Sequence, residues 1–176
     1  MSAASAPQTP RGLIALDVDG TVILEDESPS AGVVEAVAHA VAQGYLVTLA
    51  TGRSWESTDR ILDMLGIAPD YVVCSNGAVV MRREGDGYVR DHVATFDATD
   101  VLELLSEHVP HGKYMVELAD GRRLFTEDMH DWNLATGRKV DFDQLASEPV
   151  CRVVVVAPDE SDADFVQRVE TMGLHN

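Results

Sequence analysis

Short apolar runs alternate with amphipathic segments over the first half of the chain. The runs at residues 13–17, 45–50 and 71–74 have the length of buried strands, and each is followed by a polar turn that contains glycine. Amphipathic segments of helical period lie between the runs. Strands that alternate with helices indicate an α/β fold, so this half of the chain predicts a Rossmann-like parallel sheet.

The two helices between these strands carry their own start and stop signals. Apolar residues recur at helical spacing over residues 33–42, with Ser30 as the predicted N-cap and Gly44 as the C-terminal stop. The second helix is predicted to begin after Ser54 and to end at Gly66. Each helix is therefore expected to end on a glycine just before the next strand.

The pattern changes near residue 80, where hairpin signals replace the alternation of strands and helices. Gly-containing turns separate pairs of short apolar runs, which predicts β-hairpins. The predicted elements are hairpins at residues 79–94 and 114–126, a helix at 97–109 capped by Asp97, one short helix within 127–149, a strand at 151–157, and a helix at 162–172 capped by Asp162. We therefore expect a disordered tail at residues 1–11, an α/β core at 12–80 and an α+β module at 81–176.

Polar side chains follow all three predicted strands of the first half. Asp17 and Asp19 follow the first strand, Thr51 follows the second, and Asn76 follows the third. Because the carboxyl ends of parallel strands meet at one edge of a sheet, these turns are expected to form one site. A carboxylate pair at such an edge can bind Mg²⁺, and an ionised Asp can attack phosphorus. The alternative is a turn rich in Asp and Gly for conformational reasons alone.

Charge and composition limit the kinds of molecule that this protein can bind and the compartment in which it works. The chain has 176 residues and a formal net charge of −17, which excludes nucleic acid and anionic membranes as partners. Its two cysteines, Cys74 and Cys151, have no metal-ligand spacing and indicate a reducing compartment. The first ten residues lack a secretory-signal pattern, and no apolar stretch reaches the length of a membrane span. We expect a cytoplasmic protein.

The motif Asp17-Val18-Asp19-Gly20-Thr21, followed by Thr51-Gly52-Arg53 and Ser75-Asn76-Gly77-Ala78, resembles the haloacid dehalogenase (HAD) superfamily of phosphohydrolases. The spacing is similar to the Cof-type branch with its subclass IIB α/β cap domain. The resemblance covers the chain from residue 11 onward and implies a Mg²⁺-dependent phosphatase of small phosphorylated metabolites, such as sugar phosphates or nucleotide cofactors.

The resemblance also implies a role for each residue of the motifs. Asp17 is expected to be the nucleophile that forms an aspartyl-phosphate, and Asp19 the general acid and base. Asp17 and the backbone oxygen of Asp19 are the expected metal ligands. The residues expected to bind the phosphate are Gly20, Thr21, Thr51, Gly52, Arg53, Asn76 and Gly77.

The chain departs from the family's pattern in its second half. The family adds a core Lys and a Gly-Asp segment after the cap domain, but the only lysines here, Lys113 and Lys139, fall in the cap region. Carboxylates at residues 159–164 are a weaker candidate for completing the metal site. We therefore expect the core and cap domain to be incomplete, with the first strand as an exposed sheet edge prone to self-association. The alternatives are a phosphosugar mutase of the same fold and a non-catalytic remnant that binds phosphate or metal.

Overall fold

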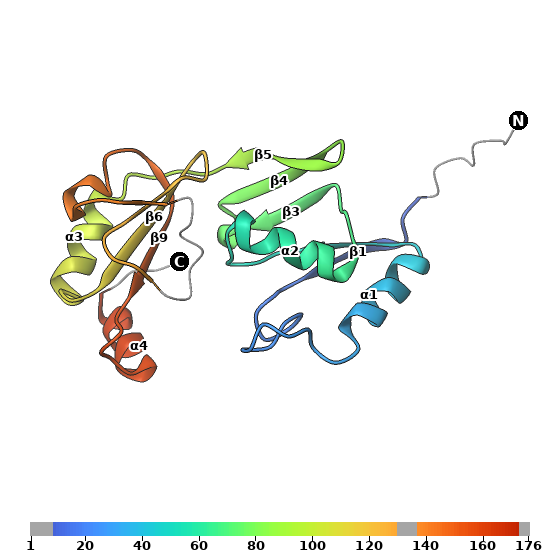
Figure 1. The fold of residues 1–176 in the computed structure, drawn as a ribbon, viewed down its shortest axis with the longest axis horizontal. Helices are drawn as coiled ribbons and strands as arrows, with labels where there is room; N and C mark the ends of the chain where they lie inside the picture. The colour runs from blue at the N-terminus through green and yellow to red at the C-terminus, as the bar shows by residue number, and fades with distance from the viewer. Residues whose placement is uncertain (1–8, 130–136, 173–176) are drawn as a thin grey trace, which may run out of the picture. The chain divides into compact units, whose positions relative to one another are not determined.

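The structure, a computed structural model, describes residues 9–129 and 137–172. Contacts divide the chain into two compact units, residues 1–92 and 93–176 (Figure 1). Residues 1–8 of the predicted tail, and residues 130–136 of the segment predicted to contain one short helix, lie outside the described residues. Within the described residues, no helix combines the length and apolar composition needed to cross a membrane.

The first unit alternates strands and helices as predicted. Its elements are β1 (Gly12–Leu16), α1 (Val33–Ala42), β2 (Tyr45–Leu49), α2 (Trp55–Leu65), β3 (Tyr71–Cys74), the 3-10 turn η1 (Ser75–Gly77), β4 (Val79–Glu84) and β5 (Gly87–Val93). β1 pairs in parallel with β2, and a parallel bridge between Ala50 and Val73 joins β2 to β3. The α/β class with a parallel β1–β2–β3 arrangement is therefore confirmed.

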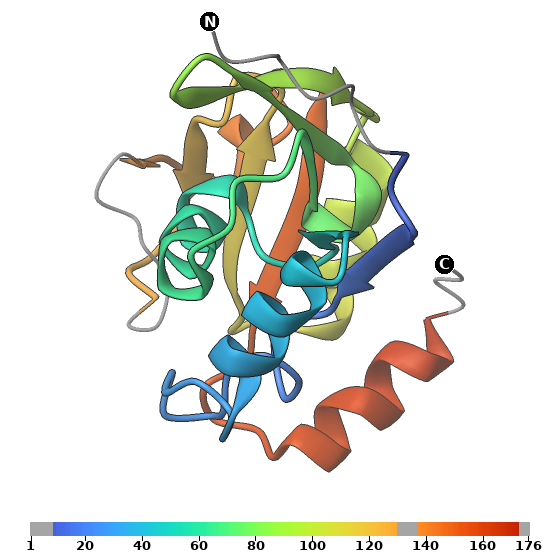
Figure 2. The same ribbon diagram turned by 90° about the vertical axis from the view of Figure 1, so that its right-hand side faces the viewer.

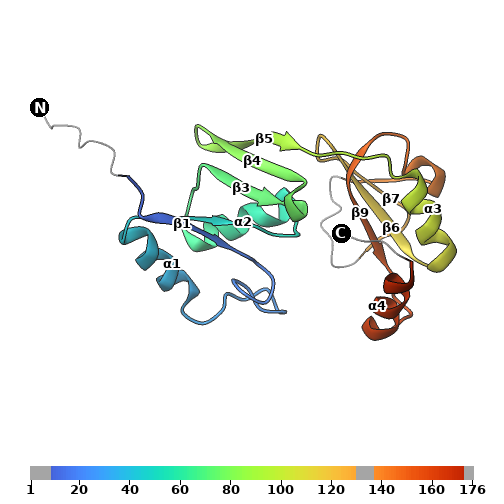
Figure 3. The ribbon, with the colours of Figure 1, turned by 180° about the vertical axis from the view of Figure 1, so that it is seen from behind.

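The helices α1 and α2 cover one face of this sheet (Figures 1 and 3). Ile61, Leu62 and Leu65 of α2 are each at most 3% exposed, so the apolar face of the helix is buried. The opposite face is more open, because Leu13 is 66% exposed and its neighbour across the β1–β2 pair, Leu46, is 51% exposed. Apolar surface and one edge of β1 therefore remain uncovered by the described residues.

The prediction that Ser30 caps the first helix is wrong. Gly32 occupies the N-cap position of α1 at a φ of 75°, and the helix begins at Val33. The Ser30 hydroxyl instead donates a hydrogen bond of 2.9 Å to the backbone oxygen of Thr21. Ser30 therefore fastens the turn after β1 rather than the helix.

The first hairpin is confirmed, but it continues the sheet of the first unit. β4 pairs antiparallel with β3, and β5 follows as the third strand of that sheet. The contacts accordingly divide the chain between His92 and Val93, later than the boundary expected near residue 80. The change in the sequence pattern near residue 80 therefore corresponds to a change from parallel to antiparallel strands within the first unit.

The second unit is built on an antiparallel sheet with the strand order β8-β7-β6-β9. Its elements are α3 (Thr99–His108), β6 (Lys113–Leu118), β7 (Arg123–Phe125), β8 (Arg138–Lys139), the 3-10 turn η2 (Phe142–Gln144), β9 (Val150–Val156) and α4 (Asp162–Thr171). β8 is the exception to the antiparallel pattern, because it pairs in parallel with β7. The second predicted hairpin, the strand and both helices are confirmed, and α4 is a continuous helix after β9 (Figure 2).

Two helix caps in this unit lie one residue from their predicted positions. Ala98 occupies the N-cap position of α3, although the Asp97 carboxylate accepts a hydrogen bond of 2.9 Å from the backbone N–H of Thr99. Ser161, not Asp162, caps α4, and its hydroxyl accepts from the backbone N–H of Asp164. Both helices nevertheless begin with the polar capping chemistry that the sequence indicates.

Candidate active site

The turn after β1 is anchored by one buried residue between two exposed carboxylates. Val18 has no exposed surface, and its carbonyl accepts backbone hydrogen bonds from Thr21, Val22 and Ile23 at 3.3, 2.9 and 3.0 Å. Asp17 and Asp19 flank Val18 and are both exposed. The buried anchor therefore fixes the backbone of the turn while both carboxylates stay open to solvent.

The turn after β2 holds a buried threonine. Thr51 is only 4% exposed, and its backbone N–H donates to the carbonyl of Val73 at 3.0 Å. Its hydroxyl oxygen accepts a hydrogen bond of 3.1 Å from the backbone N–H of Arg53. The Thr51 hydroxyl therefore shapes the turn, and as a donor it retains a proton for a further acceptor.

The turn after β3 adopts an uncommon backbone conformation. Ser75, Asn76 and Gly77 have φ values of 49°, 55° and 93°, which place three successive residues in the left-handed region. The backbone N–H of Ser75 donates to Arg53 at 2.8 Å, and that of Asn76 donates to Thr51 at 3.0 Å. Backbone hydrogen bonds therefore join the second turn to the third.

Gly52 lies where these two turns approach each other closely. A Cβ atom at this position would lie 2.9 Å from the side-chain oxygen of Asn76. Real Cβ contacts essentially never come so close, so a larger residue would displace the Asn76 amide. The glycine predicted as part of a phosphate-binding turn therefore also has a packing role.

Arg53 joins the first turn to the second. Its Nε lies 3.1 Å from both carboxylate oxygens of Asp19, and its Nη2 lies 2.8 Å from Oδ1. The hydrogen bond to Asp19 raises the pKa of Arg53 above its usual value, with burial of the guanidinium acting in the opposite direction. Arg53 is 19% exposed and Asp19 is 60% exposed, so water screens this ion pair.

All three predicted turns therefore meet at one edge of the sheet. The structure brings Asp19, Thr51, Arg53 and Asn76 together through the contacts above, and Gly52 packs against Asn76. Gly20, at a φ of 71°, turns the chain directly after Asp19 and needs the freedom of a glycine. The parallel order of the strands predicted this convergence, but nothing in the sequence predicted the pairing of Arg53 with Asp19.

Sequence reasoning missed two charged residues next to this site. Glu27, in the acidic loop at residues 24–29, lies 3.4 Å from Nη1 of Arg53 and 2.5 Å from Nη2 of Arg60. Arg60 belongs to α2. No short motif links residues so far apart in the chain, so the sequence carried no direct signal.

The described residues of the site supply only some of the ligands that a divalent cation needs. Among the described residues, no group of three or more His, Cys, Asp or Glu side chains could hold a metal ion. Asp17 is exposed, while the Asp19 carboxylate is already bonded to Arg53. Mg²⁺ commonly binds through one or two protein oxygens, waters and substrate phosphate. Asp17 and the backbone oxygen of Asp19 fit that pattern better than two carboxylates would.

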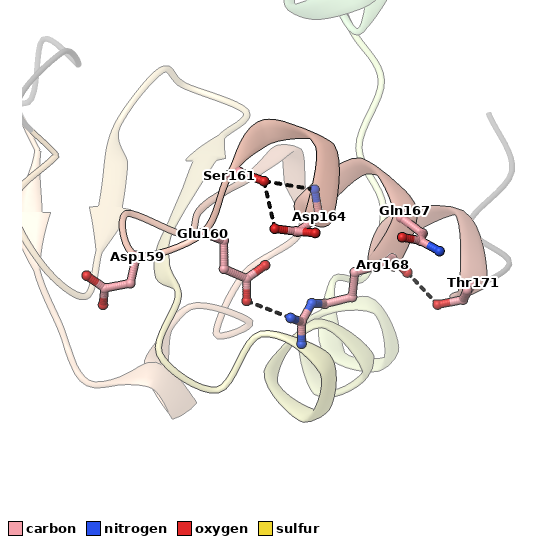
Figure 4. A pocket seen from close by; sticks show the side chains of 7 residues that line it. All are labelled: Asp159, Glu160, Ser161, Asp164, Gln167, Arg168 and Thr171. Carbon is pink, nitrogen blue, oxygen red and sulfur yellow. Dashed lines mark hydrogen bonds and ion pairs between the residues drawn. The ribbon is translucent and has the colours of Figure 1, made fainter.

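The second candidate for a metal site, at residues 159–164, is not supported. Its carboxylates line a pocket of about 460 Å³ on α4, shown in Figure 4. Glu160 is paired with Arg168 at 2.8 Å, and Asp164 accepts a hydrogen bond of 2.7 Å from Ser161. Glu160 therefore serves an ion pair and Asp164 helix capping. The pocket contains none of the residues predicted for the site.

A parallel sheet with a carboxylate pair after its first strand, and polar turns after the next two, defines an α/β protein with a ligand site at the carboxyl ends of its strands. The family model of haloacid dehalogenase-like hydrolases matches residues 14–171, so the chain belongs to this family. The family resemblance carried by the three turns is therefore confirmed.

Two curated relatives come from Bacillus subtilis (strain 168). The 5-amino-6-(5-phospho-D-ribitylamino)uracil phosphatase YitU is 25% identical over 154 residues, which cover 84% of this chain and 57% of that protein. The phosphatase YwpJ is 31% identical over 114 residues, covering 65% of this chain and 38% of that protein. The chain thus spans about half the length of the curated relatives it matches.

Solved structures share the fold at lower identity. A haloacid dehalogenase-like hydrolase from Bacteroides thetaiotaomicron has a TM-score of 0.63 at 16% identity, covering 92% of this chain and 63% of that one. A subclass IIB sugar phosphatase of the HAD superfamily has a TM-score of 0.62 at 15% identity, covering 93% and 64%. The match extends through both units of the chain.

Proposed function

We propose that this chain carries the nucleophile side of a Mg²⁺-dependent phosphatase that acts on small phosphorylated metabolites through an aspartyl-phosphate. The observation that carries the proposal is the junction of the three turns, made by the Arg53–Asp19 ion pair and by the backbone bonds from Ser75 and Asn76. Family membership and the phosphatase activity of the relatives support the same reaction class.

Asp17 is the proposed nucleophile. One of its carboxylate oxygens attacks phosphorus, and the bond from phosphorus to the leaving alcohol breaks. Water then attacks the aspartyl-phosphate, which releases inorganic phosphate and restores the Asp17 carboxylate. The exposure of Asp17 beside the buried anchor Val18 suits a group that must reach a substrate without moving the backbone.

Asp19 is the proposed general acid and base. In its protonated form it donates a proton to the leaving alcohol, and as a carboxylate it then accepts a proton from the attacking water. Arg53 orients the Asp19 carboxylate through both of its oxygens. Arg53 also places a positive charge beside the site, in a chain whose formal net charge is −17.

The phosphate is proposed to bind to the turns themselves. Gly20 and Thr21 are proposed to contribute by shaping the turn, because in the free chain their backbone N–H groups donate to the carbonyls of Ile23 and Val18 at 2.9 and 3.3 Å. The Thr51 hydroxyl, the Gly52 backbone and Arg53 add donors from the second turn. Asn76 and Gly77 form the rim of the site on the third turn. The left-handed backbone of the third turn holds this rim against the second turn, because the N–H groups of Ser75 and Asn76 donate to the carbonyls of Arg53 and Thr51.

Mg²⁺ would be held by Asp17 and the backbone oxygen of Asp19. When bound, it supplies positive charge for the phosphate oxygens and for the charge that develops on phosphorus. The second unit is proposed to act as a cap domain that selects the substrate. The protein is proposed to be cytoplasmic.

The edge of β1, unpaired among the described residues, is proposed to allow self-association.

The test is phosphate release from a generic aryl phosphate by the full 176-residue chain. We expect release that requires Mg²⁺ and stops when EDTA removes the metal. Product analysis with a phosphosugar separates the hydrolase from a mutase, which would move the phosphoryl group to another sugar hydroxyl. Binding of inorganic phosphate without any turnover would favour a non-catalytic remnant and overturn the phosphatase proposal.

A further inference from the structure

The acidic loop after β1 contains a residue whose contacts reach the proposed general acid. Glu27 Oε1 lies 3.4 Å from Nη1 of Arg53, and the same oxygen lies 2.5 Å from Nη2 of Arg60. Together with the Asp19–Arg53 pair, this forms a chain of alternating charges, Asp19–Arg53–Glu27–Arg60. It connects the turn after β1, the acidic loop, the turn after β2 and the outer surface of α2.

The contacts divide the Arg53 guanidinium between two carboxylates. Its Nε and Nη2 bond to Asp19, while its remaining nitrogen, Nη1, faces Glu27. A planar guanidinium that is held at all three nitrogens has a fixed orientation. If Glu27 were neutral, Nη1 would lose its charged partner, and the guanidinium could turn toward another anion.

The backbone of Glu27 adopts a conformation that is uncommon for a glutamate. Glu27 has a φ of 60°, which a glycine or an asparagine would adopt more readily than a glutamate. The loop is also fastened locally, because the backbone N–H of Glu27 donates to Leu24 at 3.0 Å and that of Ser28 donates to Asp26 at 3.0 Å. In this conformation the Glu27 carboxylate contacts both Arg53 and Arg60.

We infer that Glu27 is a positioning residue: it fixes the Arg53 guanidinium, through which it keeps the Asp19 carboxylate in one orientation. Arg60 has a supporting role, since it holds the Glu27 carboxylate from the helix side. The inference rests on the proposed function for its catalytic consequence, but the ordering of Arg53 by Glu27 is a property of the free protein. The two parts can therefore fail separately.

The ordering is tested by NMR on the full chain without substrate. The Nε–H signal of Arg53 is assigned by its loss in Arg53→Lys, and its exchange with water is compared in Glu27→Gln and Glu25→Gln. The second variant removes the same charge from the same loop and is the matched control. We expect exchange to become about twofold to fivefold faster in Glu27→Gln, the range expected for a screened ion pair, and to stay unchanged in Glu25→Gln.

A third variant separates the carboxylate from the loop conformation. Glu27→Gly accepts the left-handed φ without strain but also lacks the carboxylate, so we expect it to behave like Glu27→Gln. Retained protection of Arg53 in Glu27→Gly would attribute the effect to the loop backbone and overturn the inference. Equal exchange in Glu27→Gln and Glu25→Gln would overturn it as well.

The catalytic consequence is read from the kinetics of aryl phosphate hydrolysis. A less ordered Asp19 should lower kcat of Glu27→Gln about twofold to fivefold while KM stays near its original value. An increased KM with unchanged kcat would contradict a role through Asp19. If the unmodified chain releases no phosphate, the proposed function fails, while the NMR comparison still decides whether Glu27 orders Arg53.

Discussion

Charged side chains occupy two different settings in the two units. At the turns of the first unit, Asp19 is 60% exposed and Glu27 is 53% exposed, and their ion pairs lie at the surface. In the sheet of the second unit, Glu117 on β6 has no exposed surface and Arg123 on β7 is only 3% exposed. Glu117 lies directly opposite Arg123 on one side and Arg152 of β9 on the other.

The difference in exposure suggests that the charges at the turns serve chemistry and that the charges in the second sheet serve stability. Exposed charges at strand ends can change partners at small cost, because water solvates whatever they release. A buried charge must remain paired, since leaving it alone in the interior costs several kcal/mol, on the order of the net stability of a domain. Substitutions at the turns should therefore alter activity more than stability, and substitutions in the sheet of the second unit should do the reverse.

The largest expected effect is on activity, at Asp17. Asp17→Asn removes the proposed nucleophile and should lower the rate of aryl phosphate hydrolysis by about 10³-fold or more. The thermal midpoint should change little, because Asp17 is exposed. Asp86→Asn, in the turn between β4 and β5, is the control and should retain full activity. Comparable activity in both variants would remove Asp17 from the mechanism.

The opposite pattern is expected at Glu117. Glu117→Gln leaves Arg123 buried opposite a neutral side chain and should lower the free energy of unfolding by about 3 kcal/mol, measured by urea denaturation. Glu148→Gln breaks an exposed pair with Arg122, of 3.2 Å, and should cost less than about 1 kcal/mol. Equal losses in the two variants would show that burial of the charge does not govern its contribution.

A smaller effect is expected where two turns touch. Gly52→Ala forces the new Cβ against the Asn76 side chain, which would lie 2.9 Å away, and should destabilise the chain by about 1 kcal/mol. The double variant with Asn76→Ala removes the clashing atom and should recover most of this loss. A double-mutant cycle of thermal or urea denaturation measures the coupling. Independent, additive effects of the two substitutions would contradict the close approach.

The uncovered edge of β1 predicts an effect on association rather than on folding. Leu13 is 66% exposed on this strand, and a lysine there should oppose strand pairing between copies. We expect Leu13→Lys to reduce any concentration-dependent increase in mass seen by light scattering. Leu24→Lys, in which a 49% exposed leucine outside the strands is replaced, should leave association unchanged.

The smallest expected effect concerns the start of α3. Hydrogen bonds from the side chain and backbone of Thr99 lower the pKa of Asp97 below its usual value. A lowered folded-state pKa means that the ionised form adds stability above the unfolded pKa and loses it as pH falls through the folded pKa. Asp97→Asn should therefore melt at a lower temperature at neutral pH, and the difference should shrink in acid. A difference independent of pH would contradict the capping role of the charge.

The sequence predicted strand ends better than side-chain partners. Asp17, Thr51 and Asn76 each follow an apolar run, and the parallel order of strands required their turns to meet. The Arg53–Asp19 pair was not predicted, because it joins residues 34 positions apart and depends on where a long side chain turns. Local patterns carry no information about such a contact.

Two further features show the same limit. Ser30 has the chemistry of a helix cap, but Gly32 takes that position because the turn after β1 uses the Ser30 hydroxyl. The burial of Glu117 was also not predicted, since a charged residue in a strand normally marks the solvent-facing side. In both cases a tertiary contact decided between roles that the local sequence left open.

The most direct test of the central claim is to trap the phosphorylated chain. The full chain is mixed with Mg²⁺ and an aryl phosphate and quenched in acid, and the site of any phosphoryl group is located by mass spectrometry of its peptides. We predict a hydroxylamine-sensitive phosphoryl group on Asp17 that is absent from Asp17→Asn. Steady release of phosphate with no label on Asp17, or with equal label in Asp17→Asn, would contradict the account.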